Sequence, residues 1–254
     1  MSAIAPNMTE TEWQSRVDCA AGHRLLDLYG LTDLVEGLVS VRITGEPDAF
    51  LIKGYGDFFD EVRASGLHKI RFDDRPDVGA GRPLNYASCN QVKYILQARP
   101  DINAVIHTHT DATAVVASLE DGFQPMTQHG FIAAPHVAYV DFDVEIDDAC
   151  MEKTVAALGE RKILLMRNHG MMVIGESLAE AFFLARALDI ACRCQLDAMH
   201  AGARIRMPDD DPARTKQMIH DYTFHPEHLH IFNGSMQWDG LKRKLDRERP
   251  GYET

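Results

Sequence analysis

The sequence predicts an α/β protein in which helices cover both faces of a mixed or antiparallel sheet. Predicted strands and helices alternate irregularly, and two strands near the N-terminus are separated only by a short turn. A purely parallel sheet would need a long crossover between successive strands. The 254 residues, 45% of them hydrophobic, contain no repeat, low-complexity tract or long linker, so we expect residues 1–254 to form one domain.

The N-terminal part of the chain predicts a helix followed by a β-hairpin. Thr9, with Glu12 three residues later, is the capping-box pattern that begins a helix, and apolar residues follow at helical spacing. Residues 37–43 and 49–54 have the composition of strands. Between them, residues 44–48 (Thr-Gly-Glu-Pro-Asp) are turn formers, so we expect the two strands to pair.

The remaining elements follow from the same patterns. Further strands are predicted at residues 67–73, 103–109 and 136–142, and on both sides of a turn at residues 168–170. Further helices are predicted at residues 86–99, 110–122, 147–160 and 177–203. A loop rich in Gly, Pro and Asp is predicted at residues 73–85. Residues 207–254 are polar and interrupted by prolines, so we expect a C-terminal extension of short helices and surface-draped chain.

Composition excludes some partners and suggests a compartment. The net charge of −12 argues against nucleic acid or an anionic membrane surface as the main partner, because both favour a basic footprint. The five cysteines form no CxxC pair, which is typical of reduced thiols in a cytoplasm. The N-terminal segment lacks the pattern of a signal peptide, and no apolar run approaches the length of a membrane span. We therefore expect a cytoplasmic protein that acts on a small molecule.

A His-X-His pair is the first chemical signal. His107 and His109 stand at the end of an apolar run with one residue between them. Residues i and i+2 of a strand point to the same face, so the two imidazoles would project together. Neutral imidazole is a common ligand of zinc, iron, cobalt and nickel. Taken alone, the pair fits either a shared metal or one packed and one solvated histidine.

A catalytic metal site needs a third protein ligand and an open coordination position. His169 is the strongest candidate, because it follows an apolar strand at a turn, where sites are commonly built. His129 and His136 flank a predicted strand and are weaker candidates. The direct competitor is a second His-X-His pair, His228 and His230, which lies in the polar tail and has no long buried strand to hold it.

Two segments of the chain resemble the class II aldolase/adducin family. They are ASCNQVKYILQARPDINAVIHTHT (87–110) and MRNHGMMVIGESLAEAFFLARALDIACRCQ (166–195), and the resemblance extends over roughly residues 10–205. It implies a three-layer α/β/α domain around a largely antiparallel sheet, and a homotetramer. It also implies one divalent metal, usually Zn²⁺ with Fe²⁺, Mn²⁺ or Co²⁺ as alternatives, held by the residues that match the family ligands: His107, His109 and His169.

The chain departs from the family pattern at the position of the acid/base. The aldolases carry Pro-Ser-Ser-Glu before the helix at 86–99, and their glutamate works beside the metal. We match that motif to residues 87–90, which places Asn90 at the glutamate position. An amide cannot take up a proton at neutral pH. Aldol cleavage by the usual glutamate-assisted route is therefore not expected, although Asn90 remains a candidate active-site residue.

The loops that bind phosphate in the sugar-phosphate members are also altered. Leu38 takes the place of an asparagine in a Gly-Asn pair. The second loop, usually Thr-Pro-Ser-Gly, corresponds to residues 53–56, where Gly56 is retained but Lys53 and Tyr55 replace the two hydroxyl residues. Lys53 could still meet an anion. A phosphosugar is thus not the favoured substrate, and Gly56 is kept as a candidate substrate-binding residue.

Three further residues are candidates with structural alternatives. Tyr139 falls where the family often places a tyrosine near the pocket; it is either a proton donor or a core tyrosine with a satisfied hydroxyl. Ser88 and Cys89, at a helix N-terminus, could donate hydrogen bonds to an anionic oxygen of a substrate. The alternative, which we favour for Ser88, is that it simply caps the helix.

Two functions fit these residues. The first is a metal-dependent enzyme, lyase-like as an aldolase or decarboxylase, acting on a small carbonyl or hydroxy-acid substrate. The second is an adducin-like binding or structural module in which a metal only braces the site. The resemblance implies that the adducin head has lost the ligands, so retention of the three histidines favours the enzyme, whereas the missing glutamate favours the module or a different reaction.

Overall fold

A seven-stranded sheet forms the centre of the protein. The computed structural model describes residues 8–73, 83–143, 147–202 and 204–254. The strands lie in the order β3-β2-β1-β4-β7-β6-β5, and every neighbouring pair is antiparallel except β5 and β6, which are parallel. Their bounds are β1 Leu38–Ile43, β2 Glu46–Ile52, β3 His68–Arg71, β4 Ala104–Thr108, β5 Val137–Val140, β6 Ile163–Met166 and β7 Gly170–Gly175. The predicted mixed sheet is confirmed.

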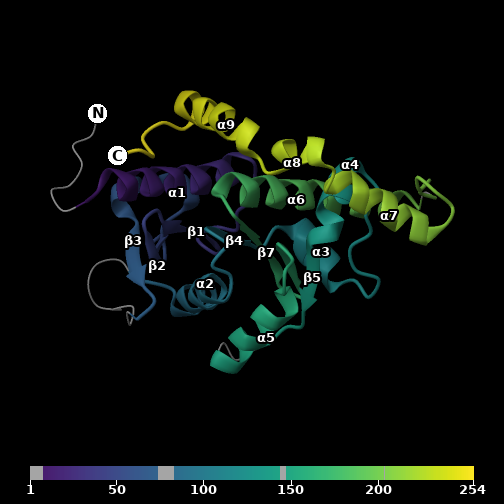
Figure 1. The fold of residues 1–254 in the computed structure, drawn as a ribbon, viewed down its shortest axis with the longest axis horizontal. Helices are drawn as coiled ribbons and strands as arrows, with labels where there is room; N and C mark the ends of the chain where they lie inside the picture. Colours follow the sequence, from purple (N-terminus) through teal and green to yellow (C-terminus); the bar gives the residue numbers. More distant parts are fainter. Residues whose placement is uncertain (1–7, 74–82, 144–146, 203) are drawn as a thin grey trace.

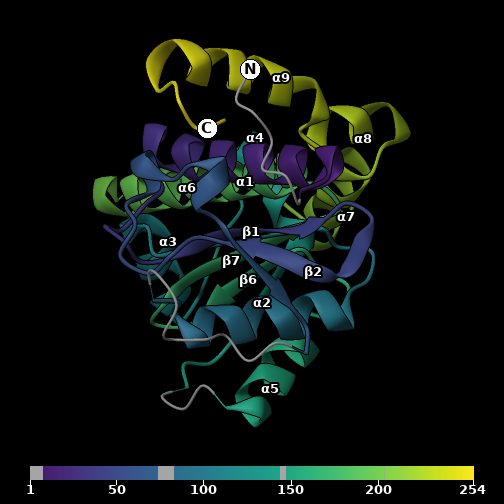
Figure 2. The same cartoon turned by 90° about the vertical axis from the view of Figure 1, so that its left-hand side faces the viewer.

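Helices cover both faces of this sheet, as predicted (Figures 1 and 2). One face carries α1 Glu10–Leu28, α3 Asp111–Ser118, α4 Gln128–Ala133 and α6 Leu178–Ala201, and the other carries α2 Tyr86–Ala98 and α5 Asp148–Leu158. Short 3-10 helices lie at η1 Phe59–Glu61, η2 Ala64–Gly66 and η3 Ala134–His136. Helix α4 is absent from the prediction, because its six residues are too few to show a helical period.

The alternation of side chains along the strands divides the core into two layers. Ile106 and Val173 pack with α1 and α6, whereas their chain neighbours Val105 and Ile174 pack with α2. The central strands are therefore apolar on both faces, as expected for a sheet covered on both sides. The same alternation determines the face of the sheet on which each strand residue near the site lies.

Helix caps and the hairpin differ in part from the prediction. Thr9 caps α1 by accepting a bond from the Glu12 amide at 3.1 Å, as predicted. The cap of α2 is Asn85, which accepts from the Ser88 amide at 3.2 Å; the prediction of Ser88 as N-cap is wrong by three residues. Strand β2 begins at Glu46, so the hairpin turn is shorter than predicted. The predicted loop at residues 73–85 falls mostly on residues 74–82, outside those described.

The C-terminal extension is helical and packs on its own chain. It contains α7 Pro212–Thr223, α8 Pro226–Phe232 and α9 Ser235–Glu248, and α9 lies across α1 and α6 (Figure 1). Leu245 is fully buried, and Arg24 of α1 donates to the backbone oxygens of Arg249 and Pro250. The extension is therefore anchored to the core by a few buried side chains, while most of its residues lie on the surface, as predicted.

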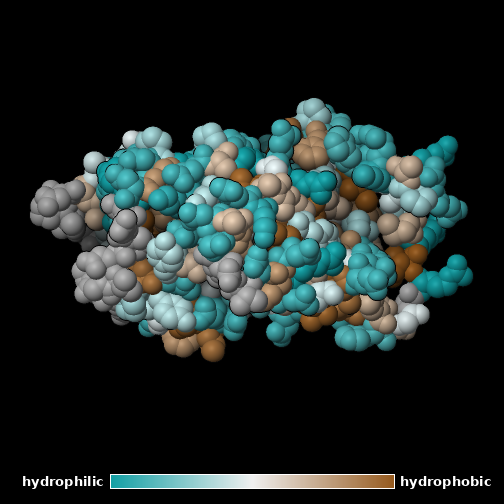
Figure 3. Space-filling model, turned by 90° about the horizontal axis from the view of Figure 1, so that it is seen from below, coloured by the Kyte–Doolittle hydropathy of each residue, from teal (hydrophilic) through white to brown (hydrophobic). Residues whose placement is uncertain are grey.

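One face of the molecule is mostly hydrophilic. On the face shown in Figure 3, hydrophilic residues predominate and hydrophobic residues are scattered among them. Within the described ranges, the helices include none that is both long and apolar enough to span a bilayer.

Candidate metal centre

Three histidines converge at one end of the sheet. His107 is the last residue but one of the buried strand β4, His109 follows it by two residues, and His169 lies in the turn between β6 and β7. The Nε2 atom of His109 is 3.0 Å from that of His107 and 2.9 Å from that of His169. Nitrogen ligands at about 2.0–2.1 Å from one tetrahedral zinc stand about 3.3 Å apart. The structure thus brings the three predicted ligands into a geometry that one metal ion fits.

Strand pairing explains why residues far apart in sequence meet here. His107 pairs with Met172 across the antiparallel β4–β7 ladder, so the turn that begins β7 lies beside His109. Gly170 is required at this crossing, because a Cβ atom there would lie 2.6 Å from the Thr108 carbonyl oxygen and 3.0 Å from His109 Cδ2. Asn168 has a φ of 56°, a conformation that asparagine adopts more readily than most residues. The Asn-His-Gly sequence is therefore the turn that presents His169.

A hydrogen bond orients His107, and a nearby carboxylate stands behind His109. His107 donates from Nδ1 to the Met171 carbonyl oxygen at 2.9 Å, which leaves the lone pair on Nε2. The carboxylate of Asp33 lies 3.7 Å from Nδ1 of His109, on the ring edge opposite the shared Nε2. Outer partners of this kind set the tautomer and orientation of metal-binding histidines. The sequence pattern does not indicate Asp33, because no local spacing links its loop to β4.

Burial favours the neutral imidazoles that a metal requires. Burial, together with the neighbouring His109 and His169, lowers the pKa of His107 to about 3. Burial also lowers the pKa of His109, partly opposed by the carboxylates of Asp33 and Glu36. The pKa of His169 is lowered by burial and by His109. The three side chains are therefore uncharged at neutral pH and present lone pairs.

Helix α2 contributes Ser88, rather than Asn90, to the small cavity beside β1. The cavity is lined by residues 35–38, Ile52, Lys53, Tyr55, Asn85 and Ser88. Asn90 lies half-buried two residues further along the helix. Cys89 is 2% exposed within the core, and burial raises the pKa of its thiol to about 11. The geometry therefore supports Ser88 as a contact residue, whereas the Cys89 thiol is packed away from any substrate.

Two residues at the positions of the family phosphate loops are already hydrogen-bonded to the backbone or buried in the core. Lys53 donates from Nζ to the carbonyl oxygens of Val35 at 2.7 Å and Asp57 at 3.2 Å, and burial lowers its pKa to about 8. Leu38 is 1% exposed in the core. Gly56 has a φ of 95°, and the space around its α-carbon is open. Lys53 is thus turned inward, which disfavours its predicted contact with an anion.

Tyr139 lies on the opposite face of the sheet from His107. Its hydroxyl accepts a hydrogen bond from the Phe123 amide at 2.7 Å, and the Arg167 guanidinium stands 4.4 Å from its ring centroid. Tyr139 packs with the core layer of α1 and α6, whereas β4 directs His107 to the layer of α2. Within one chain the geometry favours the structural alternative for this tyrosine.

The competing His-X-His pair lies on a helix. His228 and His230 belong to α8, where residues two apart do not face each other. His228 instead donates from Nδ1 to the Tyr222 carbonyl oxygen at 2.8 Å. In the described part of the chain, the group of His, Cys and acidic residues able to hold a metal is His107, His109 and His169, whose ligand atoms lie within 4.8 Å of one another.

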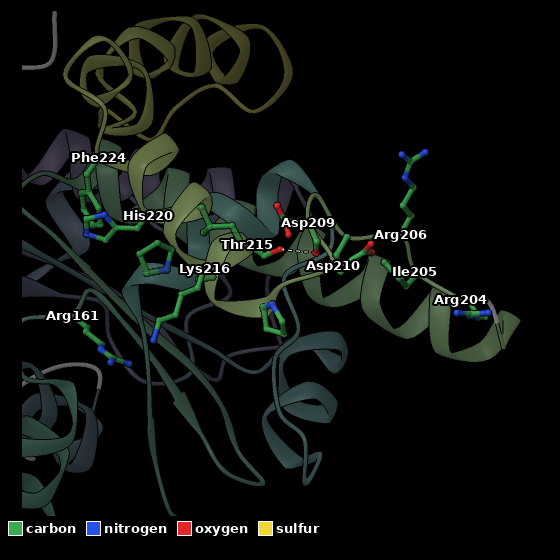
Figure 4. A pocket seen from close by; sticks show the side chains of 15 residues that line it. Arg161, Arg204, Ile205, Arg206, Asp209, Asp210, Thr215, Lys216, His220 and Phe224 are labelled. Carbon is green, nitrogen blue, oxygen red and sulfur yellow. Dashed lines mark hydrogen bonds between the residues drawn. The ribbon is translucent and has the colours of Figure 1, made fainter.

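A large cavity of the described chain is remote from these histidines. It has a volume of about 1100 Å³ and lies between η3 and the segment that leads into α7. Figure 4 shows Arg161, Lys216, His220 and Phe224 on one side of this cavity. Arg204 and Arg206 lie on its other side, in the segment that precedes α7. None of the three metal-site histidines is among its lining residues. Cavity size therefore does not identify the chemical site in this protein.

Comparisons with known proteins agree with this geometry. Residues 17–196 match the family described as Class II Aldolase and Adducin N-terminal domain. A Caulobacter vibrioides protein whose name assigns it provisionally to aldolase class 2 is 34% identical over 252 residues, which cover 98% of this chain and 96% of that protein. Human beta-adducin is 33% identical over 208 residues, which cover 80% of this chain but only 28% of the adducin.

Solved structures show the same fold. An aldolase II superfamily protein from Pseudomonas syringae superimposes with a TM-score of 0.84 at 32% identity, over 98% of each chain. L-fuculose 1-phosphate aldolase from Glaciozyma antarctica superimposes with a TM-score of 0.77 at 22% identity, over 96% of each chain, a likeness of fold alone. The resemblance first seen in the sequence is confirmed: the chain belongs to the class II aldolase and adducin family.

Proposed function

We propose that this protein is a divalent-metal-dependent enzyme of the lyase kind, which acts on a small carbonyl or hydroxy-acid substrate. The observation that carries the proposal is the convergence of three neutral histidine Nε2 atoms at the end of β4. Three protein nitrogens with one open position are typical of catalytic rather than structural zinc. We propose Zn²⁺ as the metal, with Fe²⁺, Mn²⁺ or Co²⁺ as alternatives.

The residues of the site divide the work in this proposal. His107, His109 and His169 hold the metal, and the carboxylate of Asp33 orients His109 from behind. A bound divalent metal supplies a Lewis acid that polarises a carbonyl and stabilises negative charge on its oxygen. The proposed role of Ser88, which lines the small cavity beside β1, is to donate a hydrogen bond to a substrate oxygen.

The substrate is proposed to be unphosphorylated. The ammonium of Lys53 is committed to two backbone carbonyl oxygens, and Leu38 is buried in the core. Neither side chain is free to pair with the charge of a dianionic phosphate. A phosphorylated substrate would therefore bind weakly, because burying an unpaired charge costs free energy. The reaction also proceeds without the usual glutamate on α2, since Asn90 and Ser88 are both poor proton acceptors.

A non-catalytic role is the second candidate. The similarity to human beta-adducin over 80% of this chain supports a binding or structural module in which the metal braces the fold. We further propose that the protein is cytoplasmic and forms a homotetramer, as class II aldolases often do, with neither nucleic acid nor membrane as a partner. The intact histidine set is the observation that favours the enzyme over the module.

Metal content and cleavage together test the proposal. Purified protein should contain about one divalent metal per chain. The metal-loaded protein should cleave L-fuculose faster than L-fuculose 1-phosphate, as measured by release of the aldehyde product. Metal without cleavage of any small hydroxy-ketone would favour the module, whereas cleavage only of the phosphorylated sugar would contradict the proposed substrate class.

A further inference from the structure

We propose that Glu36, held by Tyr55, is the proton acceptor of the metal centre, in the place of the glutamate that other family members carry on α2. The inference rests on the proposed function, because it concerns the same site. Glu36 directly precedes the Gly37-Leu38 pair and Tyr55 lies in the altered loop at residues 53–56, and neither residue belongs to the metal ligand set. Three features of the structure carry the assignment.

The first feature is the register of β1 against β4. Leu38 pairs with His107 in this antiparallel ladder, so the chain that precedes β1 continues past the end of β4 toward His109. Gly37 makes the close approach possible: its φ is 86°, and a Cβ atom there would collide with the His107 carbonyl oxygen. Glu36 is therefore delivered beside the metal ligands by backbone geometry that requires a glycine.

The second feature is the environment of the Glu36 carboxylate. The Tyr55 hydroxyl donates to Glu36 Oε1 at 2.8 Å, and this bond raises the pKa of Tyr55, so the donor stays protonated. Tyr55 is the hydrogen-bond partner of this carboxylate within the described residues, which leaves Oε2 available. Both side chains line the small cavity that Ser88 enters from α2. The carboxylate is thus fixed through one oxygen, while the other can take a proton.

The third feature is the different position of the two carboxylates near His109. Both Asp33 and Glu36 act electrostatically on His109. Asp33 stands at Nδ1, on the outer side of the ring, where it can only orient the ligand. Glu36 lines the small cavity together with Leu38. Leu38 pairs with His107, and the side chains of both residues lie on the face of the sheet that α2 covers. The position of Glu36 suits contact with a substrate rather than with a ligand.

The proposed step is removal of a proton from the carbon next to the substrate carbonyl. The C–H bond breaks and its electron pair forms a carbon–carbon double bond, while the carbonyl π pair becomes a lone pair on oxygen. The proton passes to Oε2 of Glu36 and returns to carbon in the reverse step. A positioned acid or base of this kind contributes roughly 10²–10⁴ in rate.

Two measurements on zinc-loaded protein test this role. The first is exchange of the carbon-bound protons of hydroxyacetone in D₂O, followed by NMR. Glu36→Gln should lower exchange by about 10²–10⁴-fold with zinc content unchanged. The second is calorimetry with glycolohydroxamic acid in two buffers of different ionisation enthalpy. The proton lost by the hydroxamate should stay on the wild-type protein, whereas Glu36→Gln should release about one proton to the buffer.

Two further variants serve as control and support. Glu61→Gln changes an exposed carboxylate on η1 while keeping an oxygen that can accept from the Phe58 amide, and it should match the wild type in both measurements. Tyr55→Phe keeps the Glu36 carboxylate. It should lower exchange about tenfold through kcat rather than KM, with zinc content unchanged, because the carboxylate loses the hydroxyl that holds Oε1 in position.

The outcomes separate this inference from the proposed function. Unchanged exchange and unchanged proton release in Glu36→Gln would overturn the role of Glu36 while leaving a metal-dependent enzyme intact. A wild-type protein that holds zinc but neither exchanges hydroxyacetone nor binds the hydroxamate would overturn the proposed function, and this inference with it.

Discussion

The two His-X-His pairs of this chain have the same spacing and opposite structural settings. His107 and His109 end a strand that is paired on both sides, and their Nε2 atoms lie 3.0 Å apart. His228 and His230 lie on α8, a seven-residue helix of the C-terminal extension. A strand projects residues i and i+2 to one face, whereas a helix separates them. The spacing indicates a metal site only when the secondary structure is known.

The first prediction removes one histidine from each pair, and it has the largest expected effect. His107→Ala should reduce bound metal from about one per chain to near zero, because two remaining ligands leave the site incomplete. His230→Ala should leave the metal content unchanged. Elemental analysis of both purified variants measures this directly. Equal loss of metal in the two variants would contradict the assignment of the metal to the His107 pair.

The second prediction substitutes one glycine in each region. Gly170→Ala places a methyl group against the Thr108 carbonyl oxygen and the His109 ring, and should lower the free energy of unfolding by about 1–3 kcal/mol and weaken zinc binding. Gly240→Ala lies within α9, where the nearest atom to the new Cβ is Arg243 Nη2 at 3.7 Å. It should raise stability by about 0.5–1 kcal/mol. Urea unfolding distinguishes these opposite signs.

The third prediction compares two aspartates beside histidines. Asp33→Asn should weaken zinc affinity by about 10–100-fold, because its carboxylate lies at Nδ1 of a ligand. Asp221→Asn changes a carboxylate 3.4 Å from Nδ1 of His220, on exposed α7, and should leave zinc affinity unaltered. Competition with a chelator measures both constants. An unchanged affinity in Asp33→Asn would remove Asp33 from the site.

The fourth prediction concerns a buried histidine outside the metal centre and is the smallest. His23 accepts a bond from the Val39 amide at 3.1 Å, and burial lowers its pKa from 6.5 to about 3. The unfolded chain therefore binds a proton that the native chain excludes, so stability is lost as the pH falls below 6.5. The loss attributable to His23 should be about 1 kcal/mol over the first pH unit.

Metal-free protein and His23→Gln measure that contribution. The variant should lose stability less steeply than the wild type between pH 6.5 and about 5.5 in urea titrations. Identical slopes in the two proteins would show that His23 titrates normally in the native state.

Much of the fold and the ligand set was predictable from local patterns. Strand and helix periods placed most elements. The apolar run before His107 and the Asn-His-Gly turn made the three histidines candidates, and the family resemblance of the same stretches implied that they act together as ligands. These signals are contained in short stretches of sequence. Ser88 was wrongly assigned as a cap, because two suitable capping residues, Asn85 and Ser88, stand three positions apart, and the choice between them depends on where the helix begins.

The surroundings of the histidines were not predictable from the same patterns. Asp33 and Glu36 reach the centre through the register of β1 on β4, which depends on a long-range pairing. The face on which Tyr139 lies follows from the pairing of β5 with β6. Long-range register leaves little trace in a single sequence, so the ligands were identifiable whereas their hydrogen-bond partners were not.

The central claim is that one divalent metal binds the three histidines at the end of β4. Diffraction from crystals of zinc-loaded protein, recorded on both sides of the zinc absorption edge, locates such an ion without reference to activity. We expect one anomalous peak per chain, about 2.0–2.1 Å from Nε2 of His107, His109 and His169. A peak at His228 or His230, or loaded protein without a peak between the three histidines, would contradict it.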